Sequence, residues 1–161
     1  MSVSFTSLLS RARALLNGLQ WAGPLLVRIS LASVFIVTGR AHLKDLDGLT
    51  AHFIEWKIPM PGLNATIAST VELVGGILVL FGLFTRFAAI PMAFCMLVAI
   101  AAARRGDIDG VATLFAFNEF TYFACFLWLL VAGAGPISLD RLLFGRWLAS
   151  LPGAAPPSER A

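Results

Sequence analysis

Two carboxylates interrupt long apolar stretches of this 161-residue chain, and they are the residues whose type and position suggest chemistry. Glu72 lies inside the apolar run Ala65–Phe84, and Glu119 lies inside the run Val111–Ala134. Hydrocarbon cannot hydrogen-bond an ionised carboxylate, so each residue needs a partner, a proton or a polar cavity. Ionisable residues in such positions often mark proton paths through a membrane. Glu72 and Glu119 are therefore candidates for proton handling.

Three further polar residues lie where they could serve these carboxylates. Arg28 and Arg40 belong to the first apolar segment, and Tyr122 follows Glu119 by three residues, on the same helical face. Either arginine could balance negative charge, and Tyr122 could donate a hydrogen bond to a bound ring. A structural interpretation stays open, in which the carboxylates pair with the arginines or backbone donors only to fix helix packing. The arginines could also extend their side chains to the interface.

The elements that must position these residues are membrane helices. The chain is 58% hydrophobic and 13% charged, whereas a soluble domain is about 25% charged. The apolar residues form blocks of a length that spans a bilayer, about 20 residues each. We expect an all-α, integral membrane four-helix bundle with short interfacial helices. The four runs are Leu25–Gly39, Ala65–Phe84, Phe87–Ala103 and Val111–Ala134. A β-barrel is excluded because Val71–Phe84 shows no alternation of apolar and polar residues.

The runs divide the chain into three segments. Residues 1–23 carry leucines at helical spacing together with Arg11 and Arg13, which predicts an interfacial N-terminal helix. Residues 24–136 form the four-span membrane domain, and residues 137–161 form a C-terminal segment. Within the membrane domain, Leu46–Trp56 alternates apolar and charged groups at a spacing that predicts a second interfacial helix. Residues 59–62, a Pro-Met-Pro-Gly turn, end that helix.

Four spans place both termini on the same side of the membrane. Slightly more basic residues fall on that side than on the other, so the positive-inside rule predicts cytoplasmic termini. Glu72 follows Asn64 by eight residues, which places it about 12 Å below the opposite surface. Glu119 lies near the same surface. We expect the two carboxylates, together with Arg40 and His42 at the end of the first span, to converge in the half of the bundle away from the termini.

Other kinds of site receive little support from the sequence. Cys95 and Cys125 lie in different runs and form no CxxC pair, so we interpret them as buried thiols. His42 and His52 have no accompanying ligand cluster, and no metal site is expected. The basic residues form no dense patch, which argues against nucleic acid as a partner. The aromatic residues of the last run could face lipid, pack, or line a flat ring site.

Several motifs resemble the DoxX family of small bacterial membrane proteins, over roughly residues 25–143. They occur in the same order at matching spans. The matching motifs are Arg28-x6-Phe35-x3-Gly39-Arg40, Glu72-Leu73-Val74-Gly75-Gly76-x5-Gly82-Leu83-Phe84-Thr85-Arg86, Glu119-x2-Tyr122, and Gly133-x-Gly135-Pro136-x-Ser138-Leu139-Asp140. The chain departs from the family at Arg40, where members often carry lysine, and it has no sulfur-handling cysteine pair. Thiosulfate, the substrate behind the family name, is therefore not expected here.

The resemblance implies a multi-pass protein of the bacterial inner membrane, in a family linked to quinone-dependent oxidation and redox stress. Our leading hypothesis is a membrane subunit that assists electron or proton transfer, to quinone, within a larger redox complex. Since the sequence has no flavin, haem or metal motif, a protein partner would supply the electrons. Two alternatives stay open: a non-enzymatic membrane anchor or assembly factor for a soluble partner, and a small transporter or export accessory. Homo-oligomerisation is compatible with each.

Overall fold

The computed structural model describes residues 5–104 and 106–149, and this part of the chain contains helices and no strand. The helices are α1 (Phe5–Gly18), α2 (Ala22–Lys44), α3 (Leu46–Glu55), α4 (Pro61–Phe81), α5 (Thr85–Ala103), α6 (Val111–Ala116), α7 (Asn118–Ala132) and α8 (Leu139–Ala149). The predicted all-α class is confirmed. The predictions that concern the last residues, 150–161, lie outside the described residues.

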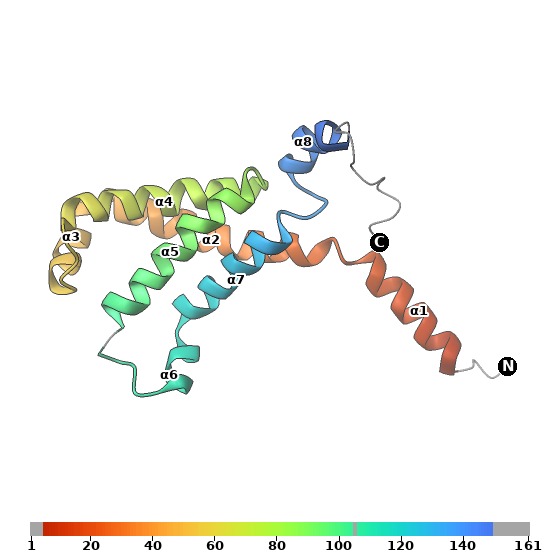
Figure 1. Cartoon of the computed structure of the whole chain (residues 1–161), viewed down its shortest axis with the longest axis horizontal. Coiled ribbons are helices and arrows are strands. Elements are labelled where there is room, and N and C mark those ends of the chain that lie inside the picture. The colour runs from red at the N-terminus through yellow and green to blue at the C-terminus, as the bar shows by residue number, and fades with distance from the viewer. Residues whose placement is uncertain (1–4, 105, 150–161) are drawn as a thin grey trace.

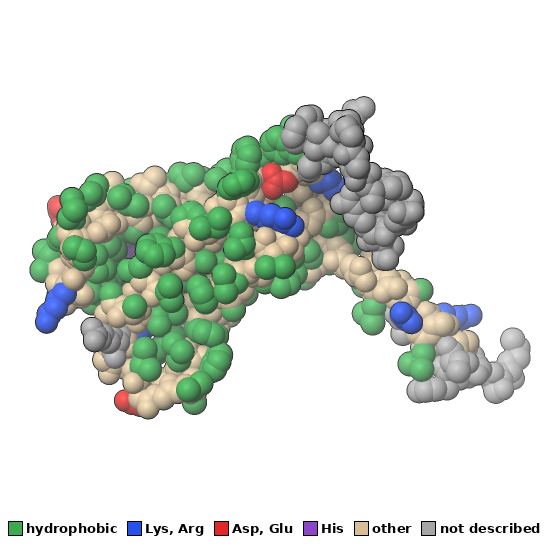
Figure 2. All heavy atoms as spheres, in the orientation of Figure 1, with side chains coloured by type: hydrophobic (Ala, Val, Ile, Leu, Met, Phe, Trp, Pro, Cys, Tyr) green, Lys and Arg blue, Asp and Glu red, His purple; other side chains and the backbone are tan. Residues whose placement is uncertain are grey.

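Three helices are long and apolar enough to cross a bilayer. α2 has 23 residues, α4 has 21 and α5 has 19. Their outward faces carry exposed apolar side chains such as Leu26, Ile67 and Phe94. In Figure 2, hydrophobic side chains cover most of the visible face of the bundle, and charged side chains lie mainly towards its ends and on α1. The predicted membrane bundle is confirmed, with an outer surface suited to lipid.

The fourth apolar run requires a correction, because it is not one continuous span. The backbone of Phe117 is extended (φ −74°, ψ 136°) and separates α6, with six residues, from α7, with 15 residues. At 1.5 Å per residue α7 is about 22 Å long, shorter than the hydrocarbon core. The break places Glu119 in the first turn of α7, where the unpaired N–H groups of a helix favour negative charge. Val111–Ala134 is therefore a helix pair rather than a single helix.

The bundle consists of two antiparallel pairs, α2 with α4 and α5 with α7, which cross obliquely (Figure 1). Glycines allow α2 and α4 to approach closely. A Cβ added to Gly39 would lie 2.5 Å from the backbone nitrogen of Leu73, and one added to Gly76 would lie 3.1 Å from that of Ile36. The shared core consists of buried residues from all four helices: Leu31, Phe35, Val79, Ala88, Ala89, Met92, Ala93, Met96, Phe126 and Leu129.

Arg28 holds together the end of the bundle from which α1 and α8 extend, which we call the α8 end. Its side chain is 2% exposed. It donates hydrogen bonds to the carbonyls of Val79 (2.8 Å), Leu80 (2.6 Å), Ala134 (2.9 Å) and Ile137 (2.6 Å). The first two carbonyls lie in the last turn of α4, where helix geometry leaves carbonyls without partners and favours positive charge. One guanidinium thus ties α2 to α4 and to the connection between α7 and α8.

Asp140 forms a second set of tertiary hydrogen bonds at the α8 end. Its Oδ1 accepts a hydrogen bond from the backbone nitrogen of Phe84 (2.7 Å), and its Oδ2 accepts one from that of Thr85 (3.1 Å). The backbone nitrogen of Asp140 donates in turn to the carbonyl of Gly82 (2.9 Å). The carboxylate therefore caps the start of α5 and fixes the short turn between α4 and α5 to α8.

The shorter helices decorate the two ends of the bundle. α3 covers the opposite end, which we call the α3 end, and packs Leu49 and Phe53 against Ala65 at the start of α4. This confirms the helix predicted from Leu46 onwards. α1 confirms the helix predicted near the N-terminus, and it projects away from the bundle with leucines such as Leu15 and Leu16 exposed (Figure 1).

We predict that Gly39→Ala lowers stability, because its new Cβ meets the backbone of α4 and the two helices must move apart. Overpacking of this kind costs about 1–3 kcal/mol. Gly23→Ala is the matched control: it lies in the same helix, and nothing lies within 4 Å of the position of its Cβ. Thermal unfolding in mild detergent, followed by circular dichroism, compares the two variants. Equal melting temperatures would contradict the close approach at Gly39.

Candidate functional site

The first polar pair lies at the α3 end, between α2 and α4. Nδ1 of His42 lies 2.8 Å from Oε2 of Glu72. The Glu72 side chain is 12% exposed and that of His42 is 38% exposed, so the pair reaches from the interior towards the surface. Gly39, one turn before His42, makes the contact sterically feasible, since a Cβ there would lie 3.0 Å from Cβ of Glu72. Close helix packing thus brings these two side chains together.

The second polar pair joins the end of α5 to the start of α7. Nε and Nη2 of Arg104 each lie 3.1 Å from Oε1 of Glu119. The Arg104 guanidinium also lies 5.4 Å from the centre of the Phe117 ring, a cation–π contact at the break in the fourth run. The other carboxylate oxygen of Glu119, Oε2, is buried and has no hydrogen-bond partner among the residues that the structure describes. Arg104 therefore secures both the carboxylate and the residue at which the helix is interrupted.

The two pairs differ in their chemistry. Arginine remains charged at all relevant pH values, so Arg104 holds Glu119 in an ionic contact. Histidine can be neutral or protonated near neutral pH, so a proton can be shared or exchanged between His42 and Glu72. Of the two predicted carboxylates, Glu72 therefore has the environment better suited to proton handling. No group of three or more His, Cys, Asp or Glu side chains suited to a metal ion occurs among the described residues.

Tyr122 lies between α7 and α2. Its ring packs edge-on against Phe35, with centroids 5.4 Å apart, and Phe35 also packs against Phe126 at 5.2 Å. Phe35 precedes Gly39 by one turn on the same face of α2, so Tyr122 lies deeper in the bundle than the His42–Glu72 pair. In this position Tyr122 packs against the hydrophobic core, on the inner side of the His42–Glu72 pair.

The two arginines predicted to balance charge lie elsewhere. Arg28 is at the α8 end, where backbone carbonyls accept its hydrogen bonds. Arg40 is exposed, and within the described part of the chain it forms no ion pair. The structure gives the carboxylates other partners, His42 for Glu72 and Arg104 for Glu119. Nor do the described contacts join the two carboxylate pairs to one another.

An apolar groove runs along the side of α7. It has a volume of about 400 Å³, and its lining includes Phe115, Phe120, Cys125 and Trp128. Val27 of α2 closes its other wall. The aromatic residues of the last apolar run thus line a groove wide enough for a planar ring or an acyl chain. Neither Glu72 nor Glu119 is part of this lining.

Sequence reasoning identified neither partner as an ion-pair residue, although each left a signal. Arg28, Phe35, Gly39 and His42 recur at helical spacing and share one face of α2, so a buried Arg28 predicts an inward-facing His42. Arg104 and Glu119 belong to the two arms of an α-helical hairpin, whose short connection brings their positions close together. Aligning the two arms of the hairpin outward from the loop between them would have placed Arg104 opposite Glu119.

Comparisons with known proteins agree with this architecture. The family model described as DoxX matches residues 23–105. The chain is 31% identical over 122 residues to inner membrane protein YphA of Escherichia coli, an alignment that covers 73% of this chain and 87% of that protein. It is 30% identical over 129 residues to inner membrane protein YqjF of the same organism, covering 80% and 98%.

A third relative carries a name that concerns activity. The chain is 29% identical over 125 residues to a Bacillus subtilis protein named "Putative oxidoreductase CatD", covering 76% of this chain and 87% of that protein. No solved structure matches the chain.

We predict that Arg104→Gln destabilises the bundle, because it removes the cation that contacts Glu119 and Phe117. Loss of one partner of a partly buried charged hydrogen bond costs about 1–3 kcal/mol. Arg40→Gln, which removes an exposed arginine near the same end, should change stability by less than about 0.5 kcal/mol. Chemical unfolding in detergent compares the two. If both variants unfold like the parent, the Arg104–Glu119 contact does not stabilise the fold.

Proposed function

The chain belongs to the DoxX family, and on that premise we propose that it is a membrane subunit assisting electron or proton transfer to quinone. In this proposal it is a multi-pass protein of the bacterial inner membrane with both termini in the cytoplasm. A protein partner in a larger redox or stress-response system supplies the electrons. The chain itself handles protons.

The His42–Glu72 pair is the observation that carries the proposal. Both groups can bind or release a proton, they lie 2.8 Å apart, and they extend inward from the α3 end. A carboxylate whose only purpose is packing would be held best by a permanent cation, as Glu119 is held by Arg104. Pairing Glu72 with a titratable histidine instead maintains the ability to exchange a proton.

The reaction assigned to this pair follows from quinone chemistry. Reduction of a quinone to a quinol consumes two electrons and two protons. Glu72 would deliver a proton to the ring oxygen, and His42 would return one to Glu72 from the α3 end. Tyr122 would donate a hydrogen bond from its phenol. Glu119, in contact with Arg104, would complete the charge balance of the region.

Two further observations are consistent with a quinone. The groove along α7 offers an aromatic, lipid-facing surface of about 400 Å³ for a ring or an isoprenoid chain. One relative carries the word oxidoreductase in its name. Since Glu72 does not line the groove, the proposal rests on the pair and not on this surface.

A second candidate function, a membrane anchor or assembly factor, is favoured by a different observation. α1 projects from the bundle with a row of exposed leucines, and α8 lies at the same end (Figure 1). Such a pair of elements could dock a soluble partner. In that case the carboxylates would serve only the fold.

The test compares quinone bound to the parent protein and to Glu72→Gln. The protein is purified in mild detergent, extracted with organic solvent, and its quinone is quantified by chromatography. We expect stoichiometric quinone in the parent and a loss of about tenfold or more in the variant, the size expected when a hydrogen bond to a charged group is lost. The glutamine can still accept a hydrogen bond from His42, which protects the fold.

Glu55→Gln is the control, since Glu55 is an exposed carboxylate on α3. Circular dichroism confirms that each variant is folded. Quinone retained in folded Glu72→Gln at the level of the parent would overturn the role of Glu72. Absence of quinone from the parent would overturn the quinone assignment and favour the anchor function.

A further inference from the structure

A hollow of about 720 Å³ opens at the α8 end, between the start of α2, the end of α4 and the start of α8. Its lining is amphipathic. Leu25, Phe81 and Leu142 contribute apolar surface, and Arg141 and Ser138 contribute polar groups. The hollow lies where membrane helices begin and end, which is the level of lipid headgroups. A ligand that fits it must combine a polar head with apolar chains.

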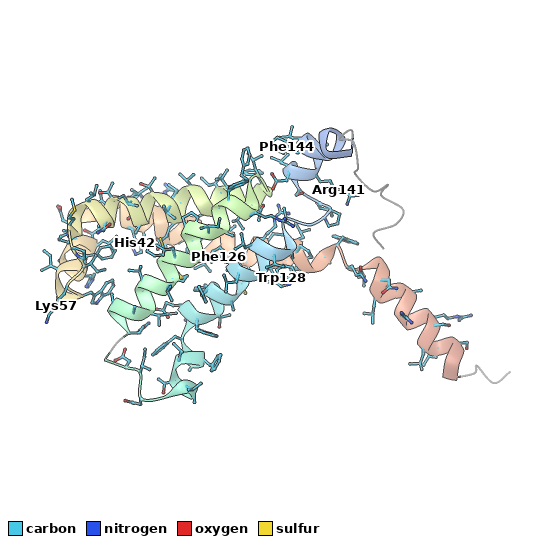
Figure 3. All side chains as sticks on the ribbon, in the orientation of Figure 1. His42, Lys57, Phe126, Trp128, Arg141 and Phe144 are labelled. Carbon is cyan, nitrogen blue, oxygen red and sulfur yellow. The ribbon has the colours of Figure 1, made fainter. Side chains whose placement is uncertain are left out.

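The basic side chains at this end have few acidic side chains near them. Arg28 forms the floor of the hollow, and all of its hydrogen bonds go to neutral carbonyls. Arg141 lies at the rim, on α8 (Figure 3). It is exposed and has no acidic side chain within 4 Å among the described residues. Both cations are therefore available to attract an anion, Arg28 through its field and Arg141 by contact.

Asp140 offsets part of the charge of Arg28, but it does not neutralise this end of the bundle as a whole. Both of its carboxylate oxygens accept hydrogen bonds from the backbone at the start of α5. In the described segments that make up this end, it is also the sole acidic residue. The basic residues there are Arg11, Arg13, Arg28, Arg86, Arg141 and Arg146. The α8 end as a whole is thus complementary to an anionic leaflet.

We propose that this hollow binds one anionic phospholipid. Its phosphate lies beside the guanidinium of Arg141, over the buried charge of Arg28. Its acyl chains lie against Leu25, Phe81 and Leu142. Such a lipid would brace the connection between α7 and α8 against the bundle, at the point that Arg28 and Asp140 also hold. The site is independent of the His42–Glu72 pair, which lies at the opposite end.

The test measures phosphatidylglycerol and phosphatidylcholine binding to the full-length protein in detergent by native mass spectrometry. We expect the parent to retain phosphatidylglycerol in preference to phosphatidylcholine. Arg141→Gln should weaken phosphatidylglycerol binding about fivefold, the effect expected for one basic residue at an anionic headgroup. Arg141→Lys, which keeps the charge, should retain most of the affinity. Circular dichroism shows whether each variant is folded.

Arg13→Gln is the matched control, because it removes an exposed arginine from the same end but outside the hollow. It should leave phosphatidylglycerol binding unchanged. Equal weakening by Arg13→Gln and Arg141→Gln would indicate diffuse surface attraction and overturn the site. Equal binding of the two lipids would overturn the anionic specificity. Full competition by inorganic phosphate would show that the hollow takes a soluble anion rather than a lipid.

Discussion

The bundle depends on one constraint: a charged side chain within a membrane helix must find a partner inside the protein. Arg28 meets it most completely, because its guanidinium donates to four backbone carbonyls, two in the last turn of α4 and two in the α7–α8 connection. The surrounding backbone leaves space for the guanidinium of Arg28. Gly82 adopts a left-handed conformation (φ 67°), and a Cβ there would lie 2.6 Å from Nη2 of Arg28. The motif around Gly82 is thus explained by the space that this arginine needs.

The same constraint produces two unlike solutions at the other end. Glu119 is held by an arginine at a break between two helices, an arrangement that anchors the turn of the chain. Glu72 is held within a close helix–helix contact by a histidine, a residue type that can gain or lose a proton near neutral pH. Stability accounts for the first pair. The second is the one feature of the bundle for which packing alone is an incomplete explanation, and this asymmetry carries the functional proposal.

Much of this architecture follows from the sequence, and the exceptions have physical reasons. Hydrophobic blocks and the Pro-Met-Pro-Gly turn predict the long helices and α3, since bilayer thickness and backbone chemistry leave little freedom. The break at Phe117 was missed because the residues on both sides of it are apolar and helix-compatible. At the break Arg104 contacts Phe117 and Glu119, a tertiary interaction that local sequence preferences do not contain. The partner of Glu72 was missed for a similar reason: arginine was the obvious cation, but Arg28 is used by carbonyls and Arg40 faces outward.

The central claim is that the His42–Glu72 pair exchanges a proton whereas the Arg104–Glu119 pair does not. Infrared difference spectroscopy of the reconstituted protein between two pH values tests it directly, because carboxyl and imidazole bands report protonation. The account predicts a coupled carboxyl and imidazole signal that disappears in Glu72→Gln and persists in Glu119→Gln. A signal that persists in Glu72→Gln but disappears in Glu119→Gln would contradict it.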